Sequence, residues 1–286
     1  MADLGTVITA IVTPFDDALA VDEDAFVSLM HHLAANGSDG FVVCGTTGEA
    51  STLSDDEHLG LVELAVRERP PGVTIIAGTG SNDTAHAVEL TARASELGVD
   101  GVLSVTPYYN RPNQRGIIAH YEAVAAASAV PVVLYNIPQR TGTDMPNDLL
   151  ARLAQIERID YVKQSNEANF ASVDGLRVYA GNDDLFARAL DIGEAGGILV
   201  SSHIVGPQMR RMVDEPGHRA EIDASLQDVY RTLFITASPT ATKAALDLLG
   251  HRVGGLRLPM VVADDAEREA VRAMLIRNGL LGHVTA

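Results

Sequence analysis

The sequence predicts one (β/α)8 barrel, also called a TIM barrel, followed by a helical extension at the C-terminus. The chain has 286 residues, which is the usual size of one such barrel. Short apolar runs alternate with amphipathic stretches from the start of the chain to about residue 220. The runs are apolar at successive positions, as parallel strands buried on both faces should be. We therefore predict the barrel over 1–220 and the helical extension, packed on the barrel, over 221–286.

Eight apolar runs of strand length are the candidate strands. They cover residues 7–13, 40–44, 74–78, 101–106, 132–136, 160–163, 177–180 and 197–201. Helical periodicity follows each of them, over residues 22–36, 55–69, 84–97, 115–127, 147–155, 166–173, 184–195 and 205–213. Eight consecutive strand-then-helix units favour a closed barrel, and an open doubly wound sheet is the alternative.

Several of the predicted helices carry start and stop signals. Ser54 precedes three acidic residues, which suits the positive end of a helix dipole. Gly37 and Gly98 follow the periodic residues as helix-ending glycines, and Pro146 lies just before the fifth helix. After about Glu221 the strand pattern stops. Three further helical patterns, over residues 220–238, 239–249 and 264–280, predict the extension.

Composition excludes several classes of function. The net charge is −17, from 38 acidic and 21 basic residues, and this excess repels nucleic acid and anionic membrane surfaces. Cys44 is the one cysteine, so no disulfide can form within the chain, as in a reducing compartment. The first residues lack the pattern of a signal peptide, and no apolar run reaches the roughly 20 residues that span a bilayer. We expect a cytoplasmic enzyme.

Lysine is unusually scarce. Only Lys163 and Lys243 are lysines, so the other 19 of the 21 basic residues are arginines. The chain meets its ordinary need for surface cations with arginine, which cannot form an imine at neutral pH. A lysine at an apolar site is therefore a candidate for amine chemistry, although two lysines could also occur by chance.

Polar residues follow the predicted strands at the end where barrel enzymes place their chemistry. Lys163 ends the sixth strand after Tyr161 and Val162, so its amine should face a partly apolar interior. Desolvation lowers the pKa of a lysine, and a neutral amine can attack a ketone to form an imine, which then acts as an electron sink. A strand-ending lysine paired with an acid is the structural alternative. Tyr135 ends the neighbouring strand and could donate and accept the protons of imine formation, or be an ordinary core tyrosine.

Other strand ends supply groups that could bind a carboxylate. Thr46 and Thr47 lie in a glycine-flanked turn whose hydroxyls and N–H groups could hold one, or the turn could simply cap the next helix. Arg140 could bind a carboxylate through two parallel hydrogen bonds, although most loop arginines are only solvated. The pair Tyr108-Tyr109 could line the site or lie in a subunit contact.

Other chemistries fit the sequence poorly. His31 and His32 are adjacent on a predicted helix and do not share a face, so they do not form a metal site, and no metal or cofactor is predicted. No phosphate-binding loop, complete dinucleotide fingerprint or nucleophile-elbow motif is present. Cys44 lies in an apolar strand and is expected to be buried rather than nucleophilic. Asp183-Asp184 precedes a predicted helix, which favours helix capping over metal binding.

With these residues in place, the chain resembles the dihydrodipicolinate synthase / N-acetylneuraminate lyase family of class I aldolases. The resemblance covers nearly the whole chain. It rests on blocks that occur in family order: GTTGE, AGTGSNDT, VTPYYNRP, LYNIPQRTG, the lysine of the sixth strand and GNDD. The family forms (β/α)8 barrels with a C-terminal helical extension, commonly as tetramers, so the resemblance implies a homotetramer or homodimer.

The resemblance also implies roles for individual residues. Lys163 would form a Schiff base with pyruvate, so no cofactor is needed, and Tyr135, Thr46 and Tyr109 would relay protons. In this family a tyrosine at the position of Tyr109 reaches across a dimer interface into the neighbouring site. The resemblance assigns substrate binding to Thr47, which would join Thr46 on the pyruvate carboxylate, and to Arg140, Gly181 and the backbone of Ile198.

Arg140 together with the GTTGE block resembles the synthases within the family. This implies condensation of pyruvate with L-aspartate 4-semialdehyde to 4-hydroxy-tetrahydrodipicolinate, in lysine and diaminopimelate biosynthesis. The residues after Lys163 and after Ile198 depart from the synthase pattern. They leave open another pyruvate-dependent aldolase or dehydratase, acting on a sugar acid or a 4-hydroxy-2-oxo acid. Asp55 and His86 replace the usual histidine and glutamate of lysine-sensitive synthases, so we do not predict feedback by lysine.

A third hypothesis is a barrel that has lost catalysis and serves as a binding or assembly module. The presence of Lys163, Tyr135 and Thr46 together argues against it.

Overall fold

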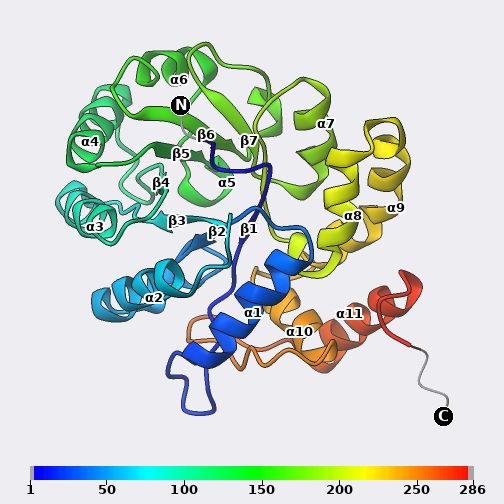
Figure 1. Cartoon of the computed structure of the whole chain (residues 1–286). Coiled ribbons are helices and arrows are strands. Elements are labelled where there is room, and N and C mark those ends of the chain that lie inside the picture. The colour runs from blue at the N-terminus through cyan, green and yellow to red at the C-terminus, as the bar shows by residue number, and fades with distance from the viewer. Residues whose placement is uncertain (1–2, 283–286) are drawn as a thin grey trace.

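The computed structural model describes residues 3–282, and over this range the predicted barrel is confirmed. Eight parallel strands pair in chain order, and β8 pairs with β1 to close the barrel. Figure 1 shows the strands at the centre with helices around them. The strands are β1 (Val7–Ala10), β2 (Gly40–Val43), β3 (Thr74–Gly78), β4 (Gly101–Val105), β5 (Val132–Asn136), β6 (Ile159–Gln164), β7 (Arg177–Ala180) and β8 (Gly196–Leu199).

Most of the predicted helices are present, and their ends agree best for the first four, whereas α7 and α9 end before the predicted residues 195 and 238. Ser54 and Glu57 form a capping box at the start of α2, and Gly37 and Gly98 have the positive φ of helix-ending glycines. The helices are α1 (Glu23–Ala35), α2 (Asp55–Glu68), α3 (Thr84–Glu96), α4 (Gln114–Ala127), α5 (Pro138–Thr141), α6 (Asn147–Leu153), α7 (Phe186–Asp191), α8 (Ser202–Asp214), α9 (Arg219–Thr232), α10 (Thr240–Leu248) and α11 (Asp265–Arg277).

The helix predicted over 166–173 is wrong. That segment forms only a short 3-10 turn, η2 (Glu167–Asn169). The reason is that Asn166 and Asn169 both donate side-chain hydrogen bonds to Asp144, which follows α5, so the segment is fixed by a polar contact and not by an amphipathic face. The α5 helix was not predicted, and its four residues are too few to give a periodic signal.

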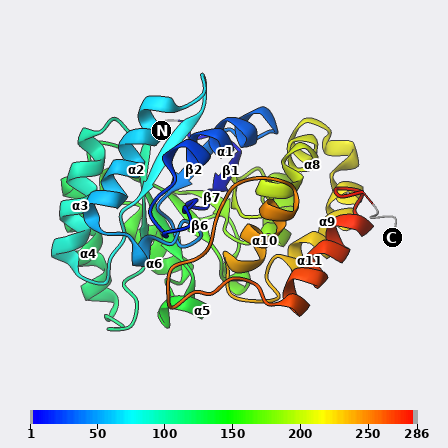
Figure 2. The ribbon, with the colours of Figure 1, turned by 90° about the horizontal axis from the view of Figure 1, so that it is seen from below.

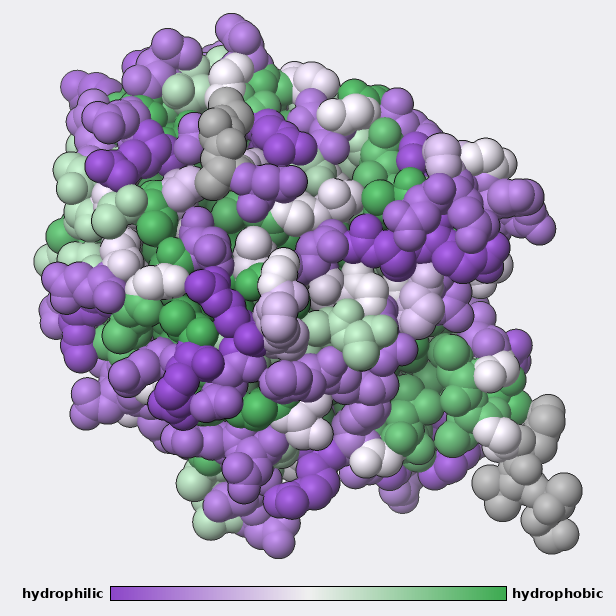
Figure 3. Space-filling model, in the orientation of Figure 1, coloured by the Kyte–Doolittle hydropathy of each residue, from purple (hydrophilic) through white to green (hydrophobic). Residues whose placement is uncertain are grey.

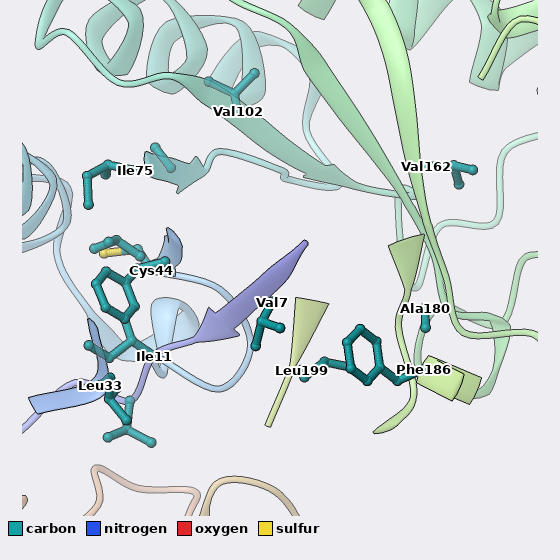
Figure 4. Packing of buried hydrophobic residues seen from close by; sticks show 14 of the residues in the cluster. Val7, Ile11, Leu33, Cys44, Ile75, Val102, Val162, Ala180, Phe186 and Leu199 are labelled. Carbon is teal, nitrogen blue, oxygen red and sulfur yellow. The ribbon is translucent and has the colours of Figure 1, made fainter. Parts of the chain in front are cut away.

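Buried side chains form two clusters, one inside the barrel and one between the strands and the helices. The outer cluster includes Phe186 of α7 and Leu199 of β8, which Figure 4 shows with other members. Inside, the rings of Tyr161 and Tyr179 stack with their centroids 5.6 Å apart, and the Tyr179 hydroxyl donates to the carbonyl of Gly5. Side chains therefore fill the barrel at its N-terminal end, and chemistry is left to the other end.

The three helices α9, α10 and α11 come after the last barrel strand. The α9 and α10 helices both contact α8, and α11 packs on α9 and α10. The long connection between α10 and α11 turns away from these helices before it returns to α11 (Figure 2), and it contacts the segments that follow β1 and β2, where the N–H of Phe15 donates to the carbonyl of Val253 and the N–H of Arg257 donates to Glu49. The division at residue 220 stays a prediction, and residues 283–286 of the predicted extension lie outside the described residues.

Hydrophilic residues cover most of the face shown in Figure 3, as the acidic composition leads us to expect. Among residues 3–282, no helix is long and apolar enough to cross a membrane.

The turn that follows β8 is fixed by two buried side chains. Asp183 accepts hydrogen bonds from the backbone N–H groups of Val200 and Ser201, at 3.0 and 2.7 Å. The imidazole of His203 lies between two backbone groups: Nε2 is 3.2 Å from the N–H of Val12, and Nδ1 is 2.8 Å from the carbonyl of Val200. These partners require a neutral ring with its proton on Nδ1.

His203 should make the stability of the fold depend on pH. Burial lowers the pKa of His203 from 6.5 to about 4. Its contribution is complete above pH 6.5 and is lost as the pH falls toward 4, because the unfolded chain takes up the proton first. The shift corresponds to about 3 kcal/mol. We expect the difference in the free energy of unfolding between the wild type and His203→Gln, measured with urea, to shrink by about this amount from pH 7 to pH 4. A constant difference over this range would contradict the assignment.

Candidate active site

Lys163 and Tyr135 lie next to each other inside the C-terminal end of the barrel. They are paired residues of the neighbouring strands β6 and β5, and each side chain is at least 94% buried, with exposures of 5% and 6%. Side chains alternate along a strand, so Lys163 points inward like Tyr161, one layer nearer the C-terminal end. The Nζ atom of Lys163 lies 4.4 Å from the centre of the Tyr135 ring.

The two lysines of the chain have different surroundings. Lys243 forms an ion pair with Glu49, at 2.7 Å from Nζ to Oε1. Lys163 forms no ion pair among the described residues, because none of their carboxylates lies within 4.0 Å of its Nζ atom. Burial raises the pKa of the Asp183 carboxyl group. Hydrogen bonds from Ser201 and Val200 oppose that rise, and so, to a smaller extent, does the positive charge of Lys163. Pairing with an acid, which was the structural alternative for Lys163, is therefore found at Lys243.

The loop after β2 places two threonine side chains beside Lys163. Thr46 is exposed and Thr47 is buried, and both line the same cavity as Lys163. The loop is a tight turn, because the N–H of Gly48 donates to the carbonyl of Gly45 and that of Glu49 donates to Thr46. A side chain at Gly48 would press on the backbone of Ile11 and of Cys44, so only glycine fits there without displacement.

Arg140 reaches the same space from α5. Pro138 is the first residue of this short helix, where its missing N–H costs nothing, and the N–H of Arg140 donates to the carbonyl of Ile137. The Arg140 side chain is exposed to solvent and lines the mouth of the barrel. Among residues 3–282, the guanidinium makes no ion pair or side-chain hydrogen bond, so its donors remain available to a ligand.

Two adjoining cavities lie at this end of the barrel, with volumes of about 320 and 430 Å³. The smaller one contains Lys163, and both are lined by Thr46, Tyr135 and Arg140. The larger one extends outward toward α2 and α3. It is lined there by Tyr108, by the buried His58, and by Asp55 and His86, which pair at 3.0 Å. The combined space is large enough for two small substrates.

The structure does not bring every predicted site residue into this space. Tyr109 is 90% exposed with a φ of 72° and lines neither cavity. Ile198 is fully buried in the inner cluster, and its side chain is not part of the lining. Gly181 does line the smaller cavity, and a side chain there would collide with Ser165.

Asp183 does not cap the helix that follows it, so that interpretation was wrong. Asp183 is itself the first residue of a short 3-10 helix, η3 (Asp183–Leu185), and its carboxylate accepts from the turn after β8 because β7 brings it beside β8. Among residues 3–282, no group of three potential ligands that could hold a metal ion is found. Cys44 is buried, as expected, and burial raises the pKa of its thiol.

One wall of the cavity was missed by the sequence reasoning. The C-terminal helix α9 and the loop after it supply Gln227, Tyr230, Arg231, Phe234 and Ser238. The prediction considered only strand ends. The spacing of Gln227, Tyr230, Arg231 and Phe234 over two turns of one helix face was the available signal.

This arrangement suits covalent capture of a small keto acid. It combines a buried amine, a neighbouring phenol that can transfer protons, two threonine hydroxyls that line the same cavity and the guanidinium of Arg140 at the mouth. The apolar walls exclude much of the water that would otherwise hydrolyse an imine.

Comparison with known proteins gives a consistent result. The model of the dihydrodipicolinate synthetase family matches residues 3–278. A 4-hydroxy-tetrahydrodipicolinate synthase of Heliobacterium modesticaldum is 42% identical, with 97% of each chain covered. Among solved structures, a dihydrodipicolinate synthase of Cyanidioschyzon merolae with lysine bound has a TM-score of 0.93 and 38% identity, covering 98% of this chain and 100% of that one. The chloride-inhibited synthase of Acinetobacter baumannii, complexed with pyruvate, has a TM-score of 0.93 and 34% identity, covering 97% and 100%.

Proposed function

The chain belongs to the dihydrodipicolinate synthetase family, and from that premise we propose that it is a 4-hydroxy-tetrahydrodipicolinate synthase. It condenses pyruvate with L-aspartate 4-semialdehyde, a step of lysine and diaminopimelate biosynthesis. The observation that carries this proposal is the buried Lys163 amine beside Tyr135, in a cavity whose mouth holds Arg140.

The proposed reaction begins at the Lys163 amine. Its lone pair attacks the keto carbon of pyruvate, and the carbinolamine then loses water to give the imine. Tyr135 moves the protons of these steps, with Thr46 as the next member of the relay. The hydroxyls and N–H groups of Thr46 and Thr47 hold the pyruvate carboxylate. The imine is the electron sink, so no cofactor is required.

Carbon–carbon bond formation follows from the imine. Loss of a proton from the pyruvate methyl group gives an enamine, which attacks the aldehyde carbon and leaves a hydroxyl group there. The amino group of the second substrate then adds to the imine carbon and displaces Lys163, which closes the ring and frees the enzyme. Arg140 holds the carboxylate of the semialdehyde during these steps through two parallel hydrogen bonds. Gly181 and the backbone of Ile198 lie beside the bound substrates.

We also assign Tyr109 to the site of a neighbouring subunit, in a homodimer or homotetramer. Its ring is 90% exposed and its backbone is held at a φ of 72°, which is uncommon for a bulky residue and favours a functional constraint. Sedimentation of the wild type and of Tyr109→Ala tests the assembly. A cytoplasmic location fits the single cysteine, Cys44.

A coupled assay tests the reaction. Purified protein should consume pyruvate and L-aspartate 4-semialdehyde and form the cyclic product. If it instead acts only on a sugar acid or a 4-hydroxy-2-oxo acid, the alternative within the family holds. If borohydride with pyruvate traps no adduct on the protein, the result favours a barrel that has lost catalysis and serves as a binding module.

Tyr135→Phe tests the proton relay. Phenylalanine keeps the ring that packs beside Lys163 but removes the hydroxyl, so we expect kcat to fall by about 10²-fold while the fold is unchanged. Rapid borohydride quenching should show slower imine formation with the same final yield. An unchanged rate of imine formation would place the relay on another group.

A further inference from the structure

The second lysine of the chain forms a buried ion pair that the reaction does not use. Lys243 lies in α10, and Glu49 ends the loop after β2, nearly 200 positions earlier in the chain. The two side chains are each 2% exposed, and Nζ lies 2.7 Å from Oε1. A charge pair this deeply buried must recover a large loss of hydration, and apolar residues often fill such a space equally well. Its presence therefore favours a role in fixing geometry over a role in stability alone.

Both members of the pair are also held from the connection between α10 and α11. Lys243 Nζ donates to the carbonyl of Gly255 at 2.7 Å, and the N–H of Arg257 donates to Glu49 Oε2 at 3.1 Å. Lys243 Nζ lies 4.3 Å from the centre of the Phe15 ring, and the Arg257 guanidinium lies 4.5 Å from the same ring. One carboxylate oxygen of Glu49 thus contacts α10, and the other accepts a hydrogen bond from the connection between α10 and α11.

The backbone transmits the position of Glu49 to the two threonines. Glu49 has a φ of 55°, in the left-handed region that non-glycine residues seldom occupy unless their surroundings fix them. Its N–H donates to the carbonyl of Thr46 at 3.1 Å, and the Thr13 hydroxyl holds the carbonyl of Gly48 at 2.6 Å. Thr46, Thr47 and Glu49 therefore belong to one rigid turn, and displacement of the Glu49 side chain moves the threonines.

We propose that Glu49 and Lys243 are positioning residues, through which the C-terminal helices hold Thr46 and Thr47 in place for the carboxylate of pyruvate. This inference rests on the proposed function, because it takes those threonines as the pyruvate-binding groups. It predicts that loss of the pair weakens pyruvate binding more than it slows the later chemical steps, which take place at Lys163 and Tyr135.

The test uses the double variant Glu49→Gln/Lys243→Met, which removes both charges and so leaves neither one buried alone. Borohydride trapping at a series of pyruvate concentrations gives the half-saturating concentration and the final yield of adduct. We expect the half-saturating concentration to rise by about tenfold or more, with the final yield retained. Asp228→Asn is the matched control, because it breaks an ion pair between α9 and α11 whose members make no contact with the loop after β2, and it should behave like the wild type.

Glu49→Asp is the second variant. It keeps both charges but shortens the carboxylate arm by one methylene, so the turn must shift or the contact must lengthen, and the half-saturating concentration should again rise. A folded double variant, or a folded Glu49→Asp, with wild-type saturation would overturn the proposal. Failure of both variants to fold would overturn it too, since the pair would then serve the fold and not the site. Absence of any adduct in the wild type would instead refute the proposed function.

Discussion

Replacement of Lys163 by arginine will abolish the borohydride-trapped pyruvate adduct and reduce turnover below detection, a loss of at least about 10⁴-fold. A guanidinium stays protonated at any pH the protein survives, so it has no lone pair with which to attack the keto carbon. The substitution keeps a long cationic side chain at the end of β6, where Lys163 is buried inside the barrel. Circular dichroism and the melting temperature should therefore remain close to those of the wild type.

The scarcity of lysine makes this experiment unusually clear. The wild type contains only Lys163 and Lys243, so digestion and mass spectrometry assign a trapped adduct between these side chains and the terminal amine without ambiguity. Lys243 is already paired with Glu49 and should carry no adduct. An adduct that persists in Lys163→Arg, on Lys243 or elsewhere, would show that the wrong amine has been chosen.

The barrel could be predicted from the sequence because its strands are covered on both faces. Each strand is then a short run of apolar residues, and the predicted run over 132–136 coincides with β5. The prediction failed where polar contacts decide the backbone. The segment 166–173 has helical periodicity, but Asn166 and Asn169 donate side-chain hydrogen bonds to Asp144. Each of these bonds joins residues that are more than twenty positions apart in the chain. Periodicity carries no information about such long-range contacts.

The candidate site shows the same division between local and distant information. Lys163 and Tyr135 could be found because a parallel barrel gathers its strand ends in one place. The wall formed by α9 could not be found in this way, because the path of the chain after β8 decides where that helix packs. The burial of Lys243 was equally invisible, since its partner Glu49 is distant in the sequence.

Arg140→Ala should separate the two substrates. The guanidinium lines the mouth of the cavity. In the role that we propose for Arg140, its loss removes two charge-assisted hydrogen bonds to the carboxylate of the semialdehyde. We expect kcat/KM for L-aspartate 4-semialdehyde to fall by about 10³-fold, while the half-saturating concentration of pyruvate in borohydride trapping changes less than about threefold. Arg140→Lys should recover only part of the loss, because an ammonium group cannot form the two parallel bonds.

Gln139→Ala provides the matched control, since Gln139 is the preceding residue of α5 and lines neither cavity. It should leave both substrates nearly unaffected, which excludes a general disturbance of the short helix as the cause. The discriminating result is the contrast within Arg140→Ala itself. If trapping of pyruvate is lost as completely as reaction with the semialdehyde, Arg140 acts on the first substrate or on the Lys163 amine. The second carboxylate must then be bound elsewhere, with Arg231 on the α9 wall as the next cation that lines the cavity.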